Sequence, residues 1–318
     1  MRRLRSLAAS GTPSAAGFAL KRRDPPRAVT QAHRALREGI PVARSQRPMP
    51  GISSNAPDVI DLELAGCSDL TTAVVKTAAD LGVQEAFFSE IAEMLGIGHL
   101  CALSVYREGG VSYMEIVPGR TLKDAGVVSV EDLERVLRKS YALRFPQMPA
   151  EERALRARVD RELLQYADWL VAQADRSENN GIAVPEQGLL RWIDEGRLGT
   201  GERLNPLYPW MPHDSFMANT SKRLGRVKLC PQTLEVIAAR CTPERLREAH
   251  RHLAKPAPGI SRPQGALLAL LRSDWYLNRM LKRREAVLRT GELTYAAGGI
   301  RTLGLHVSAA LLRAVRRE

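Results

Sequence analysis

The stretch that decides the fold is residues 175–196, which read DRSENNGIAVPEQGLLRWIDEG. Two short apolar runs within it, 182–184 and 189–193, flank a polar turn, and this pattern predicts a β-hairpin. Oxygen-bearing side chains stand on both sides of the hairpin, with Asn180 before it and Asp194 after it. Because a hairpin returns its second strand to the start of the first, we expect these two side chains to come together.

Toward the N-terminus, residues 42–122 have the short apolar runs and turn residues of a small, mainly antiparallel sheet. The sequence Glu108-Gly109-Gly110 is typical of a hairpin turn. One amphipathic segment, 83–95, interrupts the strands and ends at Gly96, a residue that is typical of a helix C-terminus. The strands are expected within 59–64, 73–75, 102–106 and 111–117.

Toward the C-terminus, the chain from residue 123 onward is expected to be mostly helical. Ser129-Val130-Glu131-Asp132 predicts a capping box that opens a helix to about Leu143. Thr242-Pro243 predicts an N-cap followed by a proline at the first helical position. Residues 195–220 are rich in Gly, Pro, Asn and Ser and are expected to form a loop. Further helices are expected at 149–174, 232–240, 243–254, 262–288 and 302–316.

These patterns together predict an α+β fold with two lobes. The N-lobe, 41–120, is expected to be a small antiparallel sheet with one helix, and the C-lobe, 121–318, is expected to be mainly helical. The lobes are expected to join near Pro118-Gly119. Residues 1–40 are expected to form a basic, flexible arm with one short helix between residues 28 and 38.

Composition and charge indicate which classes of partner the chain favours. The chain has 318 residues, a net charge of +12 and an isoelectric point of about 9.9, which favours nucleotides, nucleic acid or acidic lipid as partners. The sequence contains no run of 18 apolar residues, so no transmembrane helix is expected, and no secretory signal peptide is evident. We therefore expect a cytoplasmic protein, or an effector translocated from the cytoplasm. Four cysteines without a C-x-x-C pair predict neither a disulfide framework nor a standard zinc site.

Several polar residues fit the requirements of phosphoryl transfer, which needs a cation on the nucleotide phosphates, oxygen ligands for Mg²⁺ and a carboxylate near the attacking hydroxyl. Lys76 ends a predicted strand, and Glu85 in the helix that follows can hold it on the phosphates. Asp175 can orient the substrate hydroxyl and accept its proton. Asn180 and Asp194 can bind the metal, with Asp194 as the principal ligand.

The order of these motifs resembles a known family. Asp-Arg-x-x-x-Asn at 175–180, a hairpin, and Ile-Asp-x-Gly at 193–196 resemble the atypical kinases related to phosphoinositide kinases, secretory-pathway casein kinases and HipA-like toxin kinases. The segment from Glu85 to Leu95-Gly96-Ile97 resembles the family's helix, and residues 113–122 resemble a kinase hinge strand and the turn after it. The resemblance covers about residues 42–200 and implies a protein-kinase-like fold that uses ATP with Mg²⁺ or Mn²⁺.

The resemblance also implies where a nucleotide binds. The adenine is expected against the backbone of Glu115 to Val117. The loop that covers the phosphates is not glycine-rich, and its best candidate is 50–55, where Ser53 and Ser54 can meet phosphate oxygens. The family often has His after Asp-Arg, where this chain has Ser177. A protein serine or threonine is therefore the first choice of phosphate acceptor, and a small molecule or lipid head group is the second.

Alternatives remain open at this point. Glu90 is an alternative partner for Lys76, and Asn179 is an alternative to Asn180. The same fold could transfer a nucleotide, as an adenylyltransferase does, or serve as a pseudokinase scaffold. A different class is a basic nucleic-acid-binding protein, whose N-terminal arm and C-terminal helix would contact phosphates. His213-Asp214-Ser215 is adjacent in sequence only and does not by itself predict a catalytic triad.

Overall fold

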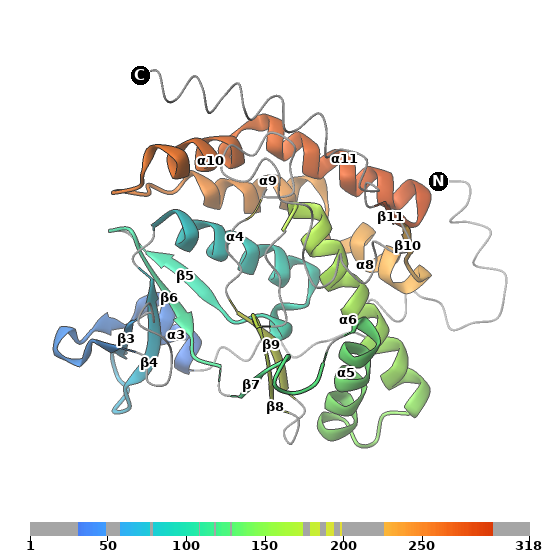
Figure 1. The fold of residues 1–318 in the computed structure, drawn as a ribbon, viewed down its shortest axis with the longest axis horizontal. Helices are drawn as coiled ribbons and strands as arrows, with labels where there is room; N and C mark the ends of the chain where they lie inside the picture. The colour runs from blue at the N-terminus through green and yellow to red at the C-terminus, as the bar shows by residue number, and fades with distance from the viewer. Residues whose placement is uncertain are drawn as a thin grey trace.

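The computed structural model describes residues 31–48, 58–76, 79–107, 109–117, 119–127, 129–173, 179–184, 189–193, 198 and 226–294. An antiparallel sheet lies on one side of the molecule, and helices make up most of the remainder (Figure 1). The expected fold class, a bilobal α+β fold with a sheet-based N-lobe and a mainly helical C-lobe, is confirmed. No helix within these ranges is long and apolar enough to cross a membrane.

The N-lobe is built on a six-stranded antiparallel sheet in the order β1-β3-β4-β6-β5, with β2 also paired to β3. The predicted turn between β5 and β6 is confirmed, since Gly109 and Gly110 both take positive φ angles of 98° and 86°, which other residues adopt only with strain. The strands are β1 (Ile40–Pro41), β2 (Arg47–Pro48), β3 (Asp58–Glu63), β4 (Thr71–Lys76), β5 (Ser104–Arg107) and β6 (Val111–Glu115).

Side chains alternate between the two faces of this sheet, as strand geometry requires. A helix, α3 (Gln31–Glu38), covers the outer face and packs on it through Ala35 and Leu36. Arg107 on β5 holds the end of this helix by donating hydrogen bonds to its last carbonyls, among them that of Ala35 at 2.6 Å. The other buried residues of the cluster that contains Ala35 and Leu36 are Ile60, Leu62, Leu64, Ala73, Val75, Leu103 and Tyr113. The short helix expected between residues 28 and 38 is thus part of the sheet lobe.

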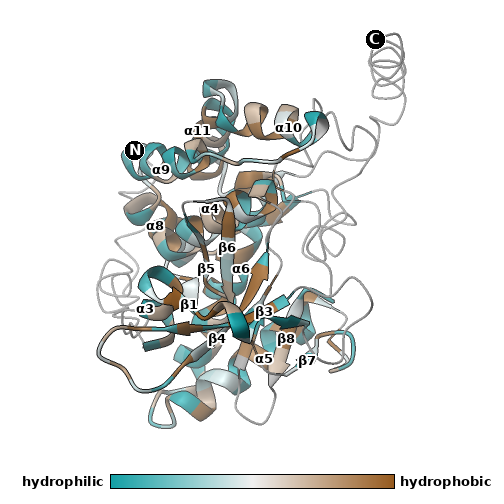
Figure 2. Cartoon of the chain, turned by 90° about the vertical axis from the view of Figure 1, so that its left-hand side faces the viewer, coloured by the Kyte–Doolittle hydropathy of each residue, from teal (hydrophilic) through white to brown (hydrophobic). Residues whose placement is uncertain are grey.

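Helix α4 (Ala79–Leu95) lies between the sheet and the C-terminal helices, and 14 of its 17 residues are buried. It contacts β5 and β6 on one side and α6, α8 and α9 on the other. Figure 2 shows hydrophobic residues along β5 and β6 in the middle of the molecule, whereas α9 on the outside is mainly hydrophilic. The expected end at Gly96 is confirmed by its φ of 78°. The expected start at Val83 and the one-sided apolar face are wrong, because the helix begins at Ala79 and is covered almost all round.

The predicted hairpin after residue 181 is present as β8 (Gly181–Val184) and β9 (Leu189–Trp192), and β7 (Arg120–Thr121) adds a third strand. Trp192 is fully buried and lies beside Cys101, which follows the short helix η3 (Gly98–Leu100). The hairpin is therefore attached to the segment that connects α4 with β5.

The C-lobe helices begin and end largely where local signals place them. Ser129 caps the first of them by accepting a hydrogen bond from the Asp132 N–H at 3.0 Å. The single helix expected at 262–288 is instead two, because the chain becomes extended at Ser273 (ψ 151°), whose hydroxyl accepts from the Tyr276 N–H at 3.3 Å. The helices are α5 (Val130–Arg144), α6 (Ala150–Val171), α8 (Pro231–Arg240), α9 (Pro243–Arg251), α10 (Arg262–Arg272) and α11 (Asp274–Thr290), and β10 (Arg226–Lys228) pairs with β11 (Glu292–Thr294).

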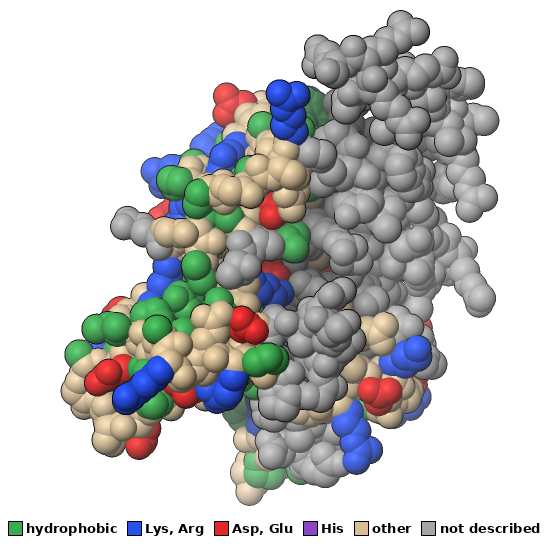
Figure 3. Space-filling model, turned by 60° about the vertical axis from the view of Figure 1, so that its left-hand side comes forward, with side chains coloured by type: hydrophobic (Ala, Val, Ile, Leu, Met, Phe, Trp, Pro, Cys, Tyr) green, Lys and Arg blue, Asp and Glu red, His purple; other side chains and the backbone are tan. Residues whose placement is uncertain are grey.

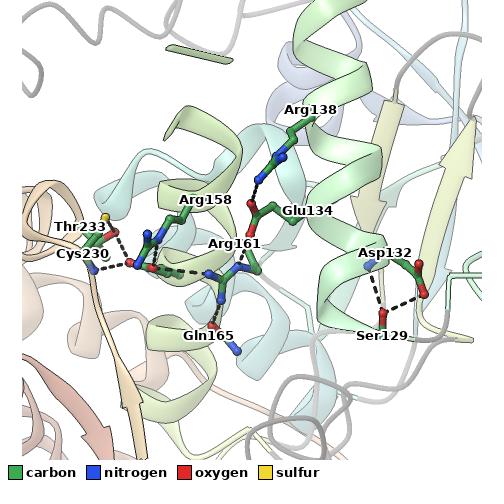
Figure 4. Close-up of polar contacts among 10 residues, drawn as sticks. Ser129, Asp132, Glu134, Arg138, Arg158, Arg161, Gln165, Cys230 and Thr233 are labelled. Carbon is green, nitrogen blue, oxygen red and sulfur yellow. Dashed lines mark hydrogen bonds and ion pairs between the residues drawn. The ribbon is translucent and has the colours of Figure 1, made fainter. Parts of the chain in front are cut away.

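A buried carboxylate joins three of these helices. Glu162 on α6 is fully buried and accepts hydrogen bonds from the Cys230 N–H at 2.8 Å and the Thr233 hydroxyl at 2.7 Å, at the start of α8. Arg161 contacts Glu162 at 3.4 Å and reaches Glu134 on α5 at 3.1 Å (Figure 4). Because a buried carboxylate is stable only when it is paired and hydrogen-bonded, these contacts fix α5 and α8 against α6.

Gly82 allows α4 to approach β6 closely. A Cβ at this position would lie 2.8 Å from both the Cβ and the Oγ of Ser112. Gly82→Ala should therefore lower the free energy of unfolding, because overpacking typically costs about 1–3 kcal/mol and alanine regains only about 1 kcal/mol of helix propensity. Urea denaturation of both proteins measures the difference.

Gly265→Ala on α10 is the matched control, because its Cβ would meet Ile260 at an ordinary 3.7 Å. This change should leave the free energy of unfolding unchanged or raise it. An equal increase of the free energy of unfolding in Gly82→Ala and Gly265→Ala would contradict the close packing of α4 on β6.

Candidate functional site

A buried ion pair joins the sheet to α4. Lys76 is the last residue of β4, and its Nζ donates a hydrogen bond to the Oε1 of Glu85. The Glu85 side chain is 0% exposed and that of Lys76 is 14% exposed. Burying either charge alone would be costly, so this pair determines how the end of β4 sits against α4.

Ser104 holds the second oxygen of Glu85. Its hydroxyl donates to Oε2 at 3.1 Å, and its backbone N–H donates to the hydroxyl of Ser89, one turn further along α4, at 3.2 Å. Both carboxylate oxygens of Glu85 are therefore engaged, which fixes the side chain. The sequence analysis missed Ser104, although a single polar residue inside the apolar run 102–106 is a signal for such a role.

An apolar cluster lies on the same face of the sheet as Lys76. Val59, Val74 and Met114 are paired across β3, β4 and β6, and all three are buried. Lys76 is two residues after Val74 on the same strand, so the two side chains point to the same face. The remaining members of the cluster are Ala102, Ile116, Val117 and Ile193.

The hairpin contributes to this cluster from the other lobe. The N–H of Ile193 donates to the carbonyl of Asn180 at 2.7 Å, and the carbonyl of Trp192 accepts from the Ala102 N–H at 2.7 Å. The first of these bonds places Asn180 opposite Ile193. Ile193 is the residue directly before Asp194 in the sequence. The role of Asn180 as a metal ligand stays a prediction.

Glu115 ties three segments together at the junction of the lobes. Its carboxylate pairs with Arg191 on β9, accepts from the Leu103 N–H at 3.3 Å and lies 3.8 Å from His33 on α3. Its own N–H donates to the Leu103 carbonyl at 2.9 Å. Sequence analysis missed Arg191, because an arginine within an apolar strand gives no sign of its partner.

The structure thus brings Lys76 and Glu85 into contact, and it places Val117 in the apolar cluster beside Lys76. The alternative partner Glu90 lies elsewhere, with its carboxylate 4.0 Å from His252. Asp175, Asp194, Ser53 and Ser54 lie outside the described residues, as does His213-Asp214-Ser215, so their roles stay predictions. Within the described part of the chain, no group of three or more His, Cys, Asp and Glu residues could hold a metal ion.

Positive charge is concentrated toward both ends of the chain, and residues 1–47 contain 11 Lys and Arg against two Asp and Glu. Residues 226–294 contain 14 Lys and Arg against six Asp and Glu, an excess of eight in a chain whose net charge is +12. Figure 3 displays one face of the molecule, where Lys and Arg side chains alternate with acidic ones and do not form a single patch. The basic N-terminal arm up to residue 30 and the expected helix 302–316 lie outside the described residues.

Comparison with known proteins adds little to this geometry. No protein-family model and no curated protein matches the chain. Among solved structures, the Helicobacter pylori proinflammatory kinase CtkA is similar, with a TM-score of 0.37 and 12% sequence identity over 76% of this chain and 96% of that chain. A likeness of this size carries no argument about family or activity.

The Lys76–Glu85 pair can be tested by removing each partner and then both. Lys76→Met leaves a buried carboxylate without its cation and should lower the free energy of unfolding by about 3–5 kcal/mol. Adding Glu85→Met should recover part of this loss, because two apolar side chains can replace a buried pair at little cost. Chemical denaturation of the four proteins in a double-mutant cycle measures the coupling.

The exposed pair of Arg247 and Glu244, at 3.7 Å, provides the control. Arg247→Met should change the free energy of unfolding little, because an exposed ion pair contributes little. A Lys76→Met protein as stable as this control would contradict the buried pair.

Proposed function

We propose that this chain is an ATP-dependent phosphotransferase of the atypical, protein-kinase-like kind. The observation that carries the proposal is the contact between Lys76 and Glu85 at the edge of an apolar cluster built from both lobes. A lysine fixed by a buried glutamate is well placed to hold phosphates, and an apolar cluster beside it offers a surface for a flat base. Asn180, whose backbone carbonyl accepts from the Ile193 N–H, would add an oxygen ligand from the other lobe.

The nucleotide would lie across the cluster. Its adenine would contact Val59, Val74 and Met114 and approach the backbone of Glu115 to Val117, while Lys76 would hold its phosphates. Ser53 and Ser54 would add hydrogen bonds to the phosphates from the covering loop. Binding sites of this kind combine apolar walls with a few well-placed polar groups.

Phosphoryl transfer would then follow from position and charge. Mg²⁺ or Mn²⁺, held by Asn180 and Asp194, would supply positive charge at the phosphates when bound. Asp175 would orient the acceptor hydroxyl and take its proton as the oxygen attacks the γ-phosphorus. The bond from the γ-phosphorus to the bridging oxygen breaks, and ADP leaves. A protein serine or threonine is the proposed acceptor, and a small molecule or lipid head group is the alternative.

Labelled ATP tests the reaction type. The purified chain is incubated with Mg²⁺ and with ATP carrying the label at the γ- or the α-phosphate. We expect transfer from the γ position only, and Asp194→Ala should reduce it by at least about 100-fold, the loss typical of removing a group that stabilises transition-state charge. Transfer from the α position would instead identify an adenylyltransferase, and no transfer from either position would favour a pseudokinase scaffold.

The role of the apolar cluster in binding adenine can be tested by comparing one substitution on each face of the sheet. Met114→Ala removes a wall of the proposed adenine site, whereas Leu62→Ala removes a similar volume from the opposite face under α3. Both should lower the free energy of unfolding by about 2–5 kcal/mol, but only Met114→Ala should raise the Kd for ATP. The Kd is measured by calorimetry at a temperature where both variants remain folded, and equal Kd values would contradict the proposed adenine site.

A second candidate function is nucleic-acid binding, which is favoured by the excess of eight positive charges in residues 226–294. It predicts an affinity for DNA or RNA that falls steeply with salt, because binding releases counterions from the phosphates. It also predicts that Asp194→Ala leaves that affinity unchanged. A chain with this property alone would show no transfer of label from ATP.

A further inference from the structure

Helix α11 has a fixed orientation about its own axis. Its buried residues are Tyr276, Met280 and Val287, and the Tyr276 hydroxyl donates to the carbonyl of Val171 on α6 at 2.8 Å. These contacts decide which side of the helix faces solvent. Figure 1 shows α11 along the upper edge of the molecule, and the side of the helix opposite its buried residues is exposed.

The cations of α11 form two sets. The helix contains five Lys and Arg against two acidic residues. Arg283 and Arg284 donate hydrogen bonds to backbone carbonyls at the C-terminal ends of α6 and α8, so the fold uses both of them. Arg279, Lys282 and Arg289 are exposed instead. The helix therefore presents most of its positive charge to solvent.

An exposed tryptophan extends the outer set of cations into a stripe. Trp275, Arg279, Lys282 and Arg289 follow one another at intervals of four, three and seven residues, which places them along one face of the helix. Trp275 is 38% exposed, and the Cζ of Arg279 lies 5.8 Å from the centroid of its ring. With the rise of an α-helix, this basic stripe is about 21 Å long.

We propose that the basic stripe of α11 binds single-stranded nucleic acid, with Trp275 stacked on a base and the three cations in contact with phosphates. Proteins bind single strands by combining a positive surface that follows the backbone with aromatic side chains on which bases stack. Every base has a π-face, so this binding does not depend on sequence. The inference does not depend on phosphoryl transfer. It rests on the second candidate function, to which it assigns a surface and a class of strand.

The composition of the stripe favours this partner over an acidic membrane and over duplex DNA. A helix that lies in a membrane interface buries an apolar face in the lipid, whereas Trp275 is the only large apolar side chain of α11 that is exposed. A duplex keeps its bases stacked on one another, so it offers Trp275 no free base. A single strand offers both a free base and a row of phosphates.

The bland alternative is a solvated face, which is the usual state of exposed charges. Glu285 is three residues after Lys282 and four before Arg289, within reach of both along the helix. Within the described part of the chain, however, neither cation forms an ion pair with it. A solvated face also gives no role to the exposed ring of Trp275.

The experiment measures the Kd of the full chain for a short labelled oligouridylate by fluorescence anisotropy at several salt concentrations. In the combined variant Arg279→Gln, Lys282→Gln, Arg289→Gln, three phosphate contacts are lost. Each contact with a single strand contributes about 0.7 to the slope of log K against log salt. The slope should therefore fall by about 2, and the Kd at about 0.1 M salt should rise by about 100-fold.

Trp275 gives a second readout that is independent of charge. Trp275→Ala should raise the Kd by about 5- to 150-fold, the contribution of stacking one base, and should leave the salt slope unchanged. Trp275→Phe should recover part of the affinity, because it retains an aromatic face. An unchanged Kd in Trp275→Ala would overturn the proposal.

A matched control removes the same charge elsewhere. Arg135, Arg138 and Lys139 are exposed on α5, which lies at the other end of the molecule from α11 (Figures 1 and 2). Changing all three to Gln should alter the Kd by less than about threefold, because salt screens charges beyond about 10 Å. Circular dichroism verifies that each variant is folded. Equal rises of the Kd in the α5 and α11 variants would show that net charge alone sets the affinity and would overturn the proposal.

The remaining outcomes separate this inference from the function on which it rests. A wild-type chain that binds no oligonucleotide would overturn the second candidate function and this inference together, and binding of phosphatidylserine vesicles in its place would assign the stripe to a membrane. Binding that survives the combined α11 substitutions would overturn this inference alone. A duplex of the same length that binds as tightly as the single strand would do so as well.

Discussion

The buried carboxylate of Glu85 is the constraint on which the rest of the arrangement depends. A carboxylate without solvent must keep a cation and hydrogen-bond donors within reach, and here Lys76 and Ser104 provide them. These partners come from β4 and β5, so the requirement fixes α4 against the sheet. The same contact places Lys76 beside the apolar cluster that Ile193 completes from the other lobe.

The C-terminal helices hold this arrangement from the opposite side. The Tyr106 hydroxyl on β5 donates to the Pro256 carbonyl at 2.5 Å, and Gln264 on α10 reaches Asp80 at 3.3 Å. Because α4 is packed on both sides, a movement of this helix would have to break contacts with the sheet and with α9 and α10 at once. Helix α4 is therefore held by packing between the sheet of the N-lobe and the helices of the C-lobe.

Local signals predicted the elements that local physics controls. Ser129 and Gly96 mark helix ends, and the β8–β9 hairpin follows its apolar runs, since caps and turns depend on a few neighbouring residues. The start of α4 was missed because Gly82 disfavours helix by about 1 kcal/mol relative to alanine, although close packing on Ser112 requires it. The break at Ser273 was missed because the apolar pattern continues through it.

The sequence by itself determined the order of the polar groups, the hairpin between Asn180 and Asp194, and the presence of a sheet lobe before a helical one. The sequence favoured Glu85 over Glu90 as the partner of Lys76, but only the tertiary structure decided between them, because α4 is buried almost all round and burial on one face does not distinguish the two. The tertiary structure also decided the partners of Ser104 and Arg191. The physical reason is that pairing between distant residues depends on how whole elements pack, and no short stretch of sequence contains that information.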